Sequence, residues 1–286
     1  MDAVPHNPPF GLRFRKMHGI GNDFVVIDAR DGADPMTPAL ARALADRRRG
    51  VGCDQIAVLQ EPGEAAADAA IAFWNADGSR AGACGNATRC IARLLLAEGR
   101  GPVLDLAVEG RGLLQAWARA DGLIAVDMGE PVTDWRAIPL ARKVDPLALP
   151  LPGEPVAVSM GNPHCVHFLD SLEGLDFEPY GAEVEQDPLF PERANVQFAE
   201  VIDRGRIRVR VWERGAGRTP ASGSSACAVA VAAHLSGLAD RRVTIELEGG
   251  ALEIEWRESD DHVLMAGPAA DVYEGVLSQD WIAETA

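Results

Sequence analysis

The chain has 286 residues, of which 47% are hydrophobic, and it carries a formal net charge of −16 with a pI of about 4.8. This length suffices for two domains with sizeable cores, and the acidity argues against nucleic acid or an anionic membrane as a partner, because both bind basic surfaces. No uninterrupted apolar run approaches the ~20 residues of a membrane span, and the polar, Pro-rich start lacks the pattern of a signal peptide.

The predicted elements alternate short strands with a few helices in both halves of the chain. The first half is predicted to contain a strand over 10–28 that bends at 19–23, a helix over 38–49, a turn over 50–55 that enters a strand, a strand over 69–74, a buried helix over 86–98 and short strands over 103–128. The Pro-rich stretch 131–155 is interpreted as a linker or domain edge. The second half is predicted to contain a strand over 156–159, a loop or helix over 177–182, strands over 195–199 and 206–212, a second buried helix over 224–238, and strands over 243–256 and 262–267.

One motif occurs twice. Trp74 precedes Cys84 by ten positions, and Trp212 precedes Ser222 by ten, with Gly following in both copies and an offset of 138 between them. A Gly-flanked Asn22 and a Gly-flanked Asn162 precede these two landmarks by 62 and 60 positions. The repeat predicts an α+β fold of two pseudo-symmetric domains, each a strand-rich sheet wrapped around a central helix. We place the N-terminal domain at 10–130 with about 272–286, and the C-terminal domain at 131–271.

Cys84 and Ser222 each stand just before a predicted helix. Unpaired backbone N–H groups and the positive end of the helix dipole gather there, so the position suits a carboxylate and lowers the pKa of a thiol from its free value of about 8.5. If the two halves face each other, one reactive group on each side could remove a proton from one face of a carbon and return one to the other. The alternatives are a buried structural thiol for Cys84 and an N-cap for Ser222.

Cofactor and metal signals are weak. The only lysines are Lys16 and Lys143, and neither has the context of a pyridoxal Schiff base, so we expect no cofactor. His164 and His167 lie three apart on a predicted strand and face opposite sides, which favours structural or second-layer roles over metal binding. The five cysteines are an odd number in a large chain and predict free thiols in a reducing cytoplasm.

Six motifs in order resemble the diaminopimelate epimerases, which are pyridoxal-independent enzymes of lysine and peptidoglycan-precursor synthesis. They are Met17–Phe24 (MHGIGNDF), Gly52–Gln55 (GCDQ), Asn75–Gly78 (NADG), Ala83–Asn86 (ACGN), Met160–His164 (MGNPH) and Glu213–Gly217 (ERGAG), with Asn195 as a single further match. The resemblance covers nearly the whole chain. It implies epimerisation of LL- to meso-diaminopimelate by a thiolate/thiol pair without a cofactor, and it suggests a homodimer.

The resemblance also assigns roles. It makes Cys84 one acid/base and puts Ser222 in the position of the second. Residues at the two helix starts would bind the substrate α-carboxylate: Gly85, Asn86, Gly223 and Ser224. Polar residues elsewhere would hold the amino groups and the distal carboxylate: Asn22, Gln55, Asn75, Asn162, Asn195, Glu213 and Arg214. His164 and Glu213 would also tune the acid/base pair.

Ser222 departs from the family pattern, which has cysteine there. A hydroxyl is a far weaker acid than a thiol, and general acid–base catalysis favours a pKa near the working pH. Three explanations stay open: an engineered substitution, a natural member that uses serine with help from a neighbour, or one-base chemistry. The alternative functions are therefore a one-base isomerase, lyase or racemase acting on another small amino or hydroxy acid, and a binding module without catalysis.

Overall fold

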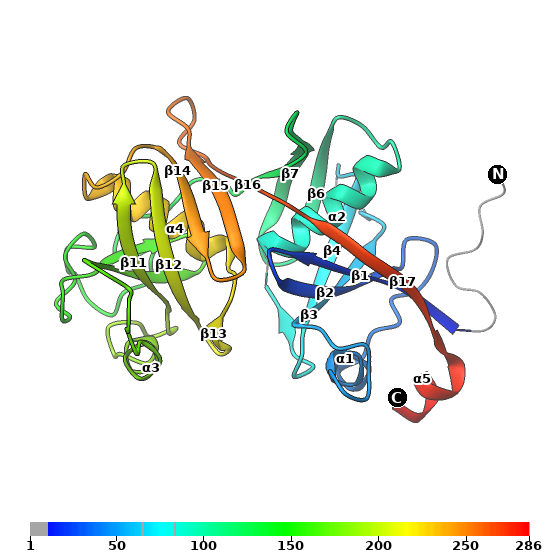
Figure 1. The fold of residues 1–286 in the computed structure, drawn as a ribbon. Helices are drawn as coiled ribbons and strands as arrows, with labels where there is room; N and C mark the ends of the chain where they lie inside the picture. The colour runs from blue at the N-terminus through cyan, green and yellow to red at the C-terminus, as the bar shows by residue number, and fades with distance from the viewer. Residues whose placement is uncertain (1–10, 64–65, 83, 286) are drawn as a thin grey trace. The chain divides into compact units, whose positions relative to one another are not determined.

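The computed structural model describes residues 11–63, 66–82 and 84–285. Phe10, at the start of the first predicted strand, and Ala83, in the ACGN motif, lie outside the described residues. The chain divides into two compact units, the first formed by 1–126 with 268–286 and the second by 127–267 (Figure 1).

The first unit is a mixed sheet with one helix buried against it. Its strands are β1 (Gly11–Gly19), β2 (Asn22–Asp28), β3 (Gln55–Gln60), β4 (Ala69–Asn75), β5 (Arg80–Ala81), β6 (Val103–Val108), β7 (Gly112–Ala118), β8 (Ile124–Asp127) and β17 (Ala270–Ser278), and its helices are α1 (Pro38–Ala45), α2 (Gly85–Ala97) and α5 (Gln279–Thr285). The strand order is β17-β1-β2-β3-β4-β6-β7-β8, and β5 adds to β4. The pairs β2–β3 and β4–β6 are parallel, and the other pairs are antiparallel.

The second unit repeats this arrangement. Its elements are β9 (Val156–Ser159), β10 (Pro163–Leu169), α3 (Glu178–Glu185), β11 (Asn195–Asp203), β12 (Arg206–Glu213), β13 (Gly217–Thr219), α4 (Gly223–Leu235), β14 (Arg242–Leu247), β15 (Gly250–Trp256) and β16 (Val263–Gly267). The strand order is β9-β10-β11-β12-β14-β15-β16, and β13 adds to β12. The pairs β10–β11 and β12–β14 are parallel, as are their counterparts in the first unit. The predicted α+β fold with two pseudo-symmetric halves is confirmed.

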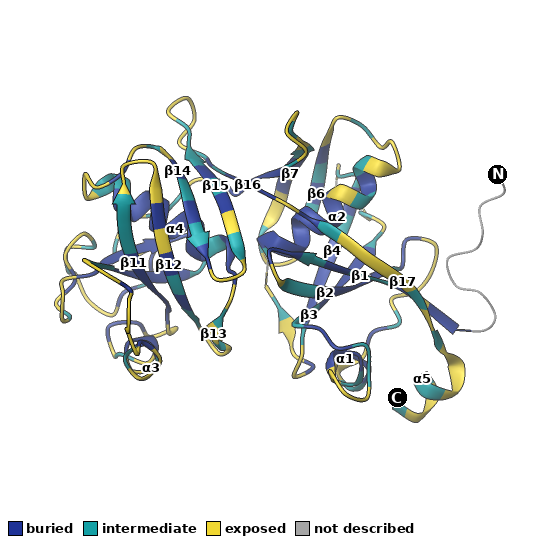
Figure 2. Cartoon of the chain, in the orientation of Figure 1, coloured by how far each residue is buried: buried dark blue, intermediate teal, exposed yellow. Residues whose placement is uncertain are grey.

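A central helix forms the core of each unit. Helix α4 packs against β9, β10, β11, β14, β15 and β16, and ten of its 13 residues are buried. A helix surrounded by strands must be apolar on all sides and short in its side chains, which explains its run of Ala and Val. Helix α2 packs in the same way against β1, β2, β6 and β7 (Figure 2). The two predicted buried helices are therefore the centres of the two units.

The structure corrects one helix boundary and part of the interpretation of the Pro-rich stretch. The first helix ends at Ala45 rather than at residue 49, because Asp46 leaves the helical conformation and its carboxylate accepts hydrogen bonds from the backbone N–H of Arg48 and Arg49 at 2.8 and 2.9 Å. The Pro-rich stretch 131–155, interpreted as a linker or domain edge, lies near the start of the second unit but is not a free linker. Its side chains Ile138, Leu140 and Leu149 are buried in the core of the second unit.

Strand β17 was not predicted from the sequence. It pairs with β1 at the other end of the chain, with Leu12 opposite Leu277. Gly275 is required there, because a Cβ at this position would lie 2.5 Å from the Phe14 ring. Six of its nine residues are exposed, which removes the alternating pattern that identifies a strand locally.

His167 on β10 predicts a pH-dependent stability. Its ring stacks on Phe198 at 5.3 Å between centroids and meets Tyr180 edge to face at 5.2 Å. Burial disfavours the charged ring and lowers its pKa from 6.5 to about 4. The unfolded chain therefore takes up a proton first, and this stabilisation is present above pH 6.5 and is lost as the pH falls towards 4.

We expect the free energy of unfolding, measured in urea, to fall between pH 7 and pH 4 by about 2–3 kcal/mol more for the wild-type protein than for His167→Phe. The Phe ring keeps the aromatic packing and removes the titration. Equal losses in the two proteins would show that His167 contributes nothing to the pH dependence.

Candidate active site

Cys84 stands at the N-cap of α2 with extended backbone and without a capping bond from its side chain. Its Sγ instead donates a hydrogen bond to Oδ1 of Asn22 at 3.8 Å. The same oxygen accepts a hydrogen bond from Nδ2 of Asn86, in the first turn of α2, at 3.1 Å. Gly85 begins the helix, so the predicted carboxylate-binding pair and Cys84 share one helix start.

The other predicted residues of the first unit lie at the same edge of its sheet. Asn22 begins β2 after a tight turn in which Ile20 and Gly21 have φ of 49° and 85°. Gln55 begins the parallel strand β3, and Asn75 ends the antiparallel strand β4 directly opposite it. The amide of Gln55 donates to Oδ1 of Asn75 at 3.0 Å. Unit 1 therefore gathers all six of its predicted site residues.

Ser222 is the counterpart of Cys84 in the second unit. It stands at the N-cap of α4, is 4% exposed, and makes no capping hydrogen bond with its side chain. Its Oγ donates to Oε2 of Glu213 at 3.0 Å, and Thr219 donates to Oε1 of the same carboxylate at 2.6 Å. Ser222 therefore occupies the N-cap position, but its side chain does not cap α4 and instead donates to a carboxylate.

A buried polar chain leads to the start of α4. Gln197 donates from Nε2 to Nδ1 of His164 at 3.0 Å, and Nε2 of His164 lies 3.0 Å from Oδ1 of Asn162. Nδ2 of Asn162 then donates to Oγ of Ser224, in the first turn of α4, at 3.5 Å. His164 and Gln197 are fully buried. His164 therefore contacts Asn162, and Asn162 in turn reaches the start of α4.

The turn after β12 holds Arg214 beside Asn195. The backbone N–H of Arg214 donates to Oδ1 of Asn195 at 3.0 Å, and its guanidinium donates to the carbonyl of Glu192 at 2.9 Å. The buried carboxylate of Glu185 anchors this turn by accepting from the backbone N–H of Gly215 and from Nε1 of Trp212. The sequence patterns did not identify Glu185 as a site residue, because it lies 27 or more positions from these partners.

Asp54 and Gln197 were also missed as site residues. Asp54 stands inside the GCDQ motif next to Gln55, so the motif itself was a signal that it lies at the site. Gln197 lies two positions after Asn195 on the same strand, and in a strand this spacing puts both side chains on one face.

The cysteines differ in exposure. Cys84 is half-buried, whereas Cys53, Cys90, Cys165 and Cys227 are buried. Burial raises the pKa of Cys53 and of Cys90 to about 12, and it also raises the pKa of Cys165. At neutral pH these three are unreactive thiols, which leaves Cys84 as the accessible one.

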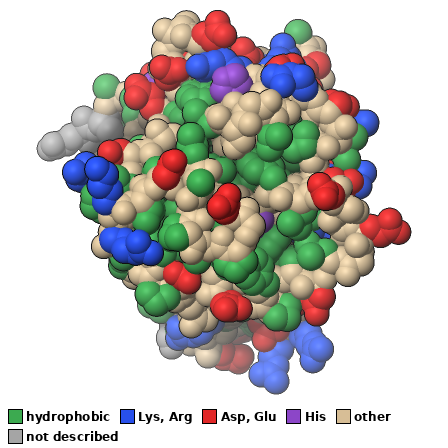
Figure 3. All heavy atoms as spheres, turned by 90° about the vertical axis from the view of Figure 1, so that its left-hand side faces the viewer, with side chains coloured by type: hydrophobic (Ala, Val, Ile, Leu, Met, Phe, Trp, Pro, Cys, Tyr) green, Lys and Arg blue, Asp and Glu red, His purple; other side chains and the backbone are tan. Residues whose placement is uncertain are grey.

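Other site types find no support in the part of the chain that the structure describes. Within it, three or more His, Cys, Asp or Glu side chains do not gather in a way that could hold a metal ion. None of the helices in these residues is long and apolar enough to cross a membrane. Figure 3 shows acidic and basic side chains interspersed with apolar ones on one face.

The fold recurs in solved structures. A phenazine biosynthesis protein of the PhzF family from Bacillus anthracis matches with a TM-score of 0.66 at 15% identity over 93% of this chain and 98% of its own. A hydroxyproline epimerase from Agrobacterium vitis matches with a TM-score of 0.66 at 16% identity over 95% and 94%. These likenesses define the class of fold.

Sequence relatives define the family. The family model described as diaminopimelate epimerase matches residues 14–133 and 156–272. Diaminopimelate epimerases of Rhodospirillum centenum and Acidiphilium cryptum are 51% and 52% identical, over 93% and 94% of this chain and 92% and 98% of theirs. The chain belongs to the diaminopimelate epimerase family, as the sequence motifs predicted.

Proposed function

We propose that this protein is an isomerase that converts LL- to meso-diaminopimelate without a cofactor, for lysine and peptidoglycan-precursor synthesis. The observation that carries the proposal is that Cys84 and Ser222 stand at the N-caps of equivalent helices, and that each side chain donates a hydrogen bond instead of capping its helix. The curated relatives named diaminopimelate epimerase support the substrate.

On one face of the α-carbon, Cys84 exchanges the proton. The thiol gives its proton to the carbanion, or the thiolate takes the α-hydrogen in the reverse direction. The positive end of the helix dipole would stabilise the thiolate once Cys84 has given up its proton. The N–H groups of the first helical turn also suit the substrate α-carboxylate, and neutralising the charge of that carboxylate makes the α-hydrogen more acidic.

On the other face, Ser222 acts with Glu213. A serine hydroxyl does not readily hold the ionised form at neutral pH, so a neighbouring base must take its proton. In the proposed step, Oγ accepts the α-hydrogen while its own proton moves to Oε2 of Glu213, 3.0 Å away. Serine is then a relay, and the carboxylate is the base that stores the proton.

The remaining predicted residues form the proposed substrate site. Those at the two helix starts would hold the α-carboxylate, namely Gly85, Asn86, Gly223 and Ser224. Those at the sheet edges would hold the amino groups and the distal carboxylate: Asn22, Gln55, Asn75, Asn162, Asn195, Glu213 and Arg214. The guanidinium of Arg214 could bind the distal carboxylate with two hydrogen bonds. We propose that His164 supports this site through Asn162.

The test is incubation with LL-diaminopimelate in deuterated water, followed by NMR of the α-hydrogen and chromatography of the stereoisomers. The proposal expects deuterium incorporation together with meso product, and faster inversion by Ser222→Cys because a thiol is the stronger acid. Absence of exchange and of meso product in both proteins contradicts it.

The serine favours one second candidate, a one-base isomerase, lyase or racemase acting on another small amino or hydroxy acid. Exchange without inversion, or new conjugated absorbance with a panel of such acids, would support that candidate. If the protein is a non-catalytic binding module, calorimetry should show tight binding of the amino acid without exchange of its α-hydrogen.

We propose that the protein is a cytoplasmic homodimer. The free cysteines support a reducing compartment. Strand β17 ends the sheet of the first unit and exposes Val272, Tyr273 and Val276 by 47–55%, an apolar edge that a second copy could cover. Sedimentation velocity of the wild type against Val276→Glu tests the dimer, and a wild-type monomer at micromolar concentration contradicts it.

A further inference from the structure

The two equivalent asparagines present opposite ends of their amides to the helix starts. In the first unit, Oδ1 of Asn22 faces α2 and accepts from Cys84 and Asn86. In the second unit, Nδ2 of Asn162 faces α4 and donates to Ser224. A carbonyl oxygen and an amide N–H have opposite effects on a neighbouring acid, since the first favours its protonated form and the second its ionised form.

Asp54 sets the orientation of Asn22. Nδ2 of Asn22 donates to Oδ2 of Asp54 at 2.8 Å, and an ionised carboxylate can only accept. The amide must therefore point its nitrogen at Asp54, which leaves its oxygen for Cys84.

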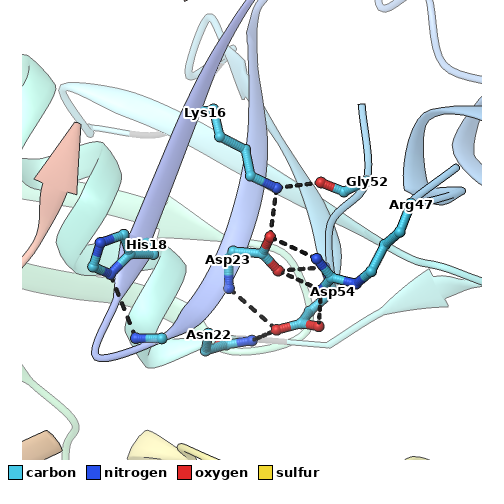
Figure 4. A network of polar contacts seen from close by, with 8 residues as sticks. Lys16, His18, Asn22, Asp23, Arg47, Gly52 and Asp54 are labelled. Carbon is cyan, nitrogen blue, oxygen red and sulfur yellow. Dashed lines mark hydrogen bonds and ion pairs between the residues drawn. The ribbon is translucent and has the colours of Figure 1, made fainter. Parts of the chain in front are cut away.

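An ion network keeps Asp54 in place (Figure 4). Arg47 donates to Oδ1 of Asp54 at 2.7 Å, and the backbone N–H of Asp23 donates to Oδ2 at 3.1 Å. Asp23 is itself held by Arg47 at 2.7 Å and by Lys16 at 2.5 Å, and Lys16 also donates to the carbonyl of Gly52. Burial alone would raise the pKa of Asp23, but the hydrogen bonds from Arg47 and Lys16 lower it to about 2. Asp23 therefore stays ionised at neutral pH and keeps Arg47 and Lys16 in place.

In the second unit, His164 orients the amide of Asn162 in the opposite way. An amide nitrogen of Gln197 donates to Nδ1 of His164, so this ring nitrogen accepts and the ring carries its proton on Nε2. That Nε2–H then donates to Oδ1 of Asn162, which turns Nδ2 towards α4.

We propose that Asp54 is a positioning residue that, through the amide of Asn22, holds Cys84 as the protonated, proton-donating member of the acid/base pair. The inference rests on the proposed function for its catalytic meaning. Without an acceptor at position 54, Nδ2 of Asn22 loses this partner, while the hydrogen bond from Asn86 still holds the amide oxygen. An amide that turns then offers Nδ2 to the sulfur, which favours the thiolate. Charged groups reach this contact through hydrogen bonds: Asp54 through Asn22, and Arg89 through Asn86.

The experiment measures the pH dependence of Cys84 alkylation by iodoacetamide, followed by peptide mass spectrometry. Asp54→Leu removes the acceptor and keeps the volume, Asp54→Asn keeps an acceptor oxygen, and Arg47→Met removes the ion pair but leaves the carboxylate. We expect the midpoint of the alkylation profile to fall by about one pH unit in Asp54→Leu and to stay near the wild-type value in the other two. Asp54→Ala replaces Asp54→Leu if the latter does not fold.

An unchanged profile in the variant without an acceptor overturns the inference. An equal shift in Arg47→Met also overturns it, because charge rather than amide orientation would then be responsible. Alkylation requires no substrate, so the result is independent of whether the protein epimerises diaminopimelate. Loss of turnover alone, with all four profiles equal, would indicate a merely structural role.

Discussion

Glu213→Gln is expected to lower the rate of inversion by about 10²–10⁴-fold, the usual contribution of a general base. The amide keeps the size of the side chain and can still hydrogen-bond to Ser222 and Thr219, but it cannot take up a proton at neutral pH. Ser222 would then lose the carboxylate to which it passes its proton.

The measurement is the turnover of LL-diaminopimelate, together with the deuterium content of substrate and product. Thr219→Val is the matched control, because it removes the other hydrogen bond to the carboxylate and leaves the base intact. We expect this control to lose less than tenfold. If Glu213→Gln and Thr219→Val lose the same amount, the carboxylate orients Ser222 and does not store its proton.

Cys84→Ala is expected to lower inversion by at least 10³-fold and to leave the melting temperature within a few degrees of the wild type. The side chain is half-buried and does not cap α2, so its removal leaves the helix start intact. Cys90→Ala, on the same helix but fully buried, is the control: it should cost stability and keep turnover.

Cys84→Ala and Glu213→Gln should differ in which stereoisomer still exchanges its α-hydrogen. Each keeps one acid/base group, which can remove and return a proton on its own face without inversion. Deuterium should therefore enter one diastereomer in Cys84→Ala and the opposite one in Glu213→Gln. Exchange of the same diastereomer in both variants would contradict the assignment of one face to each residue.

Features that depend on neighbouring residues could be predicted from the sequence. The two copies of the Trp-to-nucleophile motif predicted the duplication, and the uniform Ala/Val run at 224–238 predicted a helix buried on every side. The helix starts at Cys84 and Ser222 followed from the glycines beside them. These are short-range patterns. A helix that its own sheet surrounds must be apolar on every side, so its composition alone predicts that it is buried.

Such patterns could not predict the pairing of strands that lie far apart in the sequence. Strand β17 is exposed along most of its length, so nothing local distinguishes it from a loop until β1 lies beside it. The Pro-rich stretch looked like a linker because Pro hides periodicity, and only the core around Phe198 shows where Leu140 and Leu149 are buried.

The sequence by itself determined the family, the two-unit fold and the identities of Cys84 and Ser222 at the helix starts. Only the tertiary structure decided that Ser222 hydrogen-bonds to Glu213 rather than capping α4, and that Asn22 and Asn162 point opposite ends of their amides at their helices. The reason is that a hydroxyl or an amide has several possible partners, and its choice depends on groups such as Asp54, 32 positions from Asn22, and Gln197, 33 positions from His164.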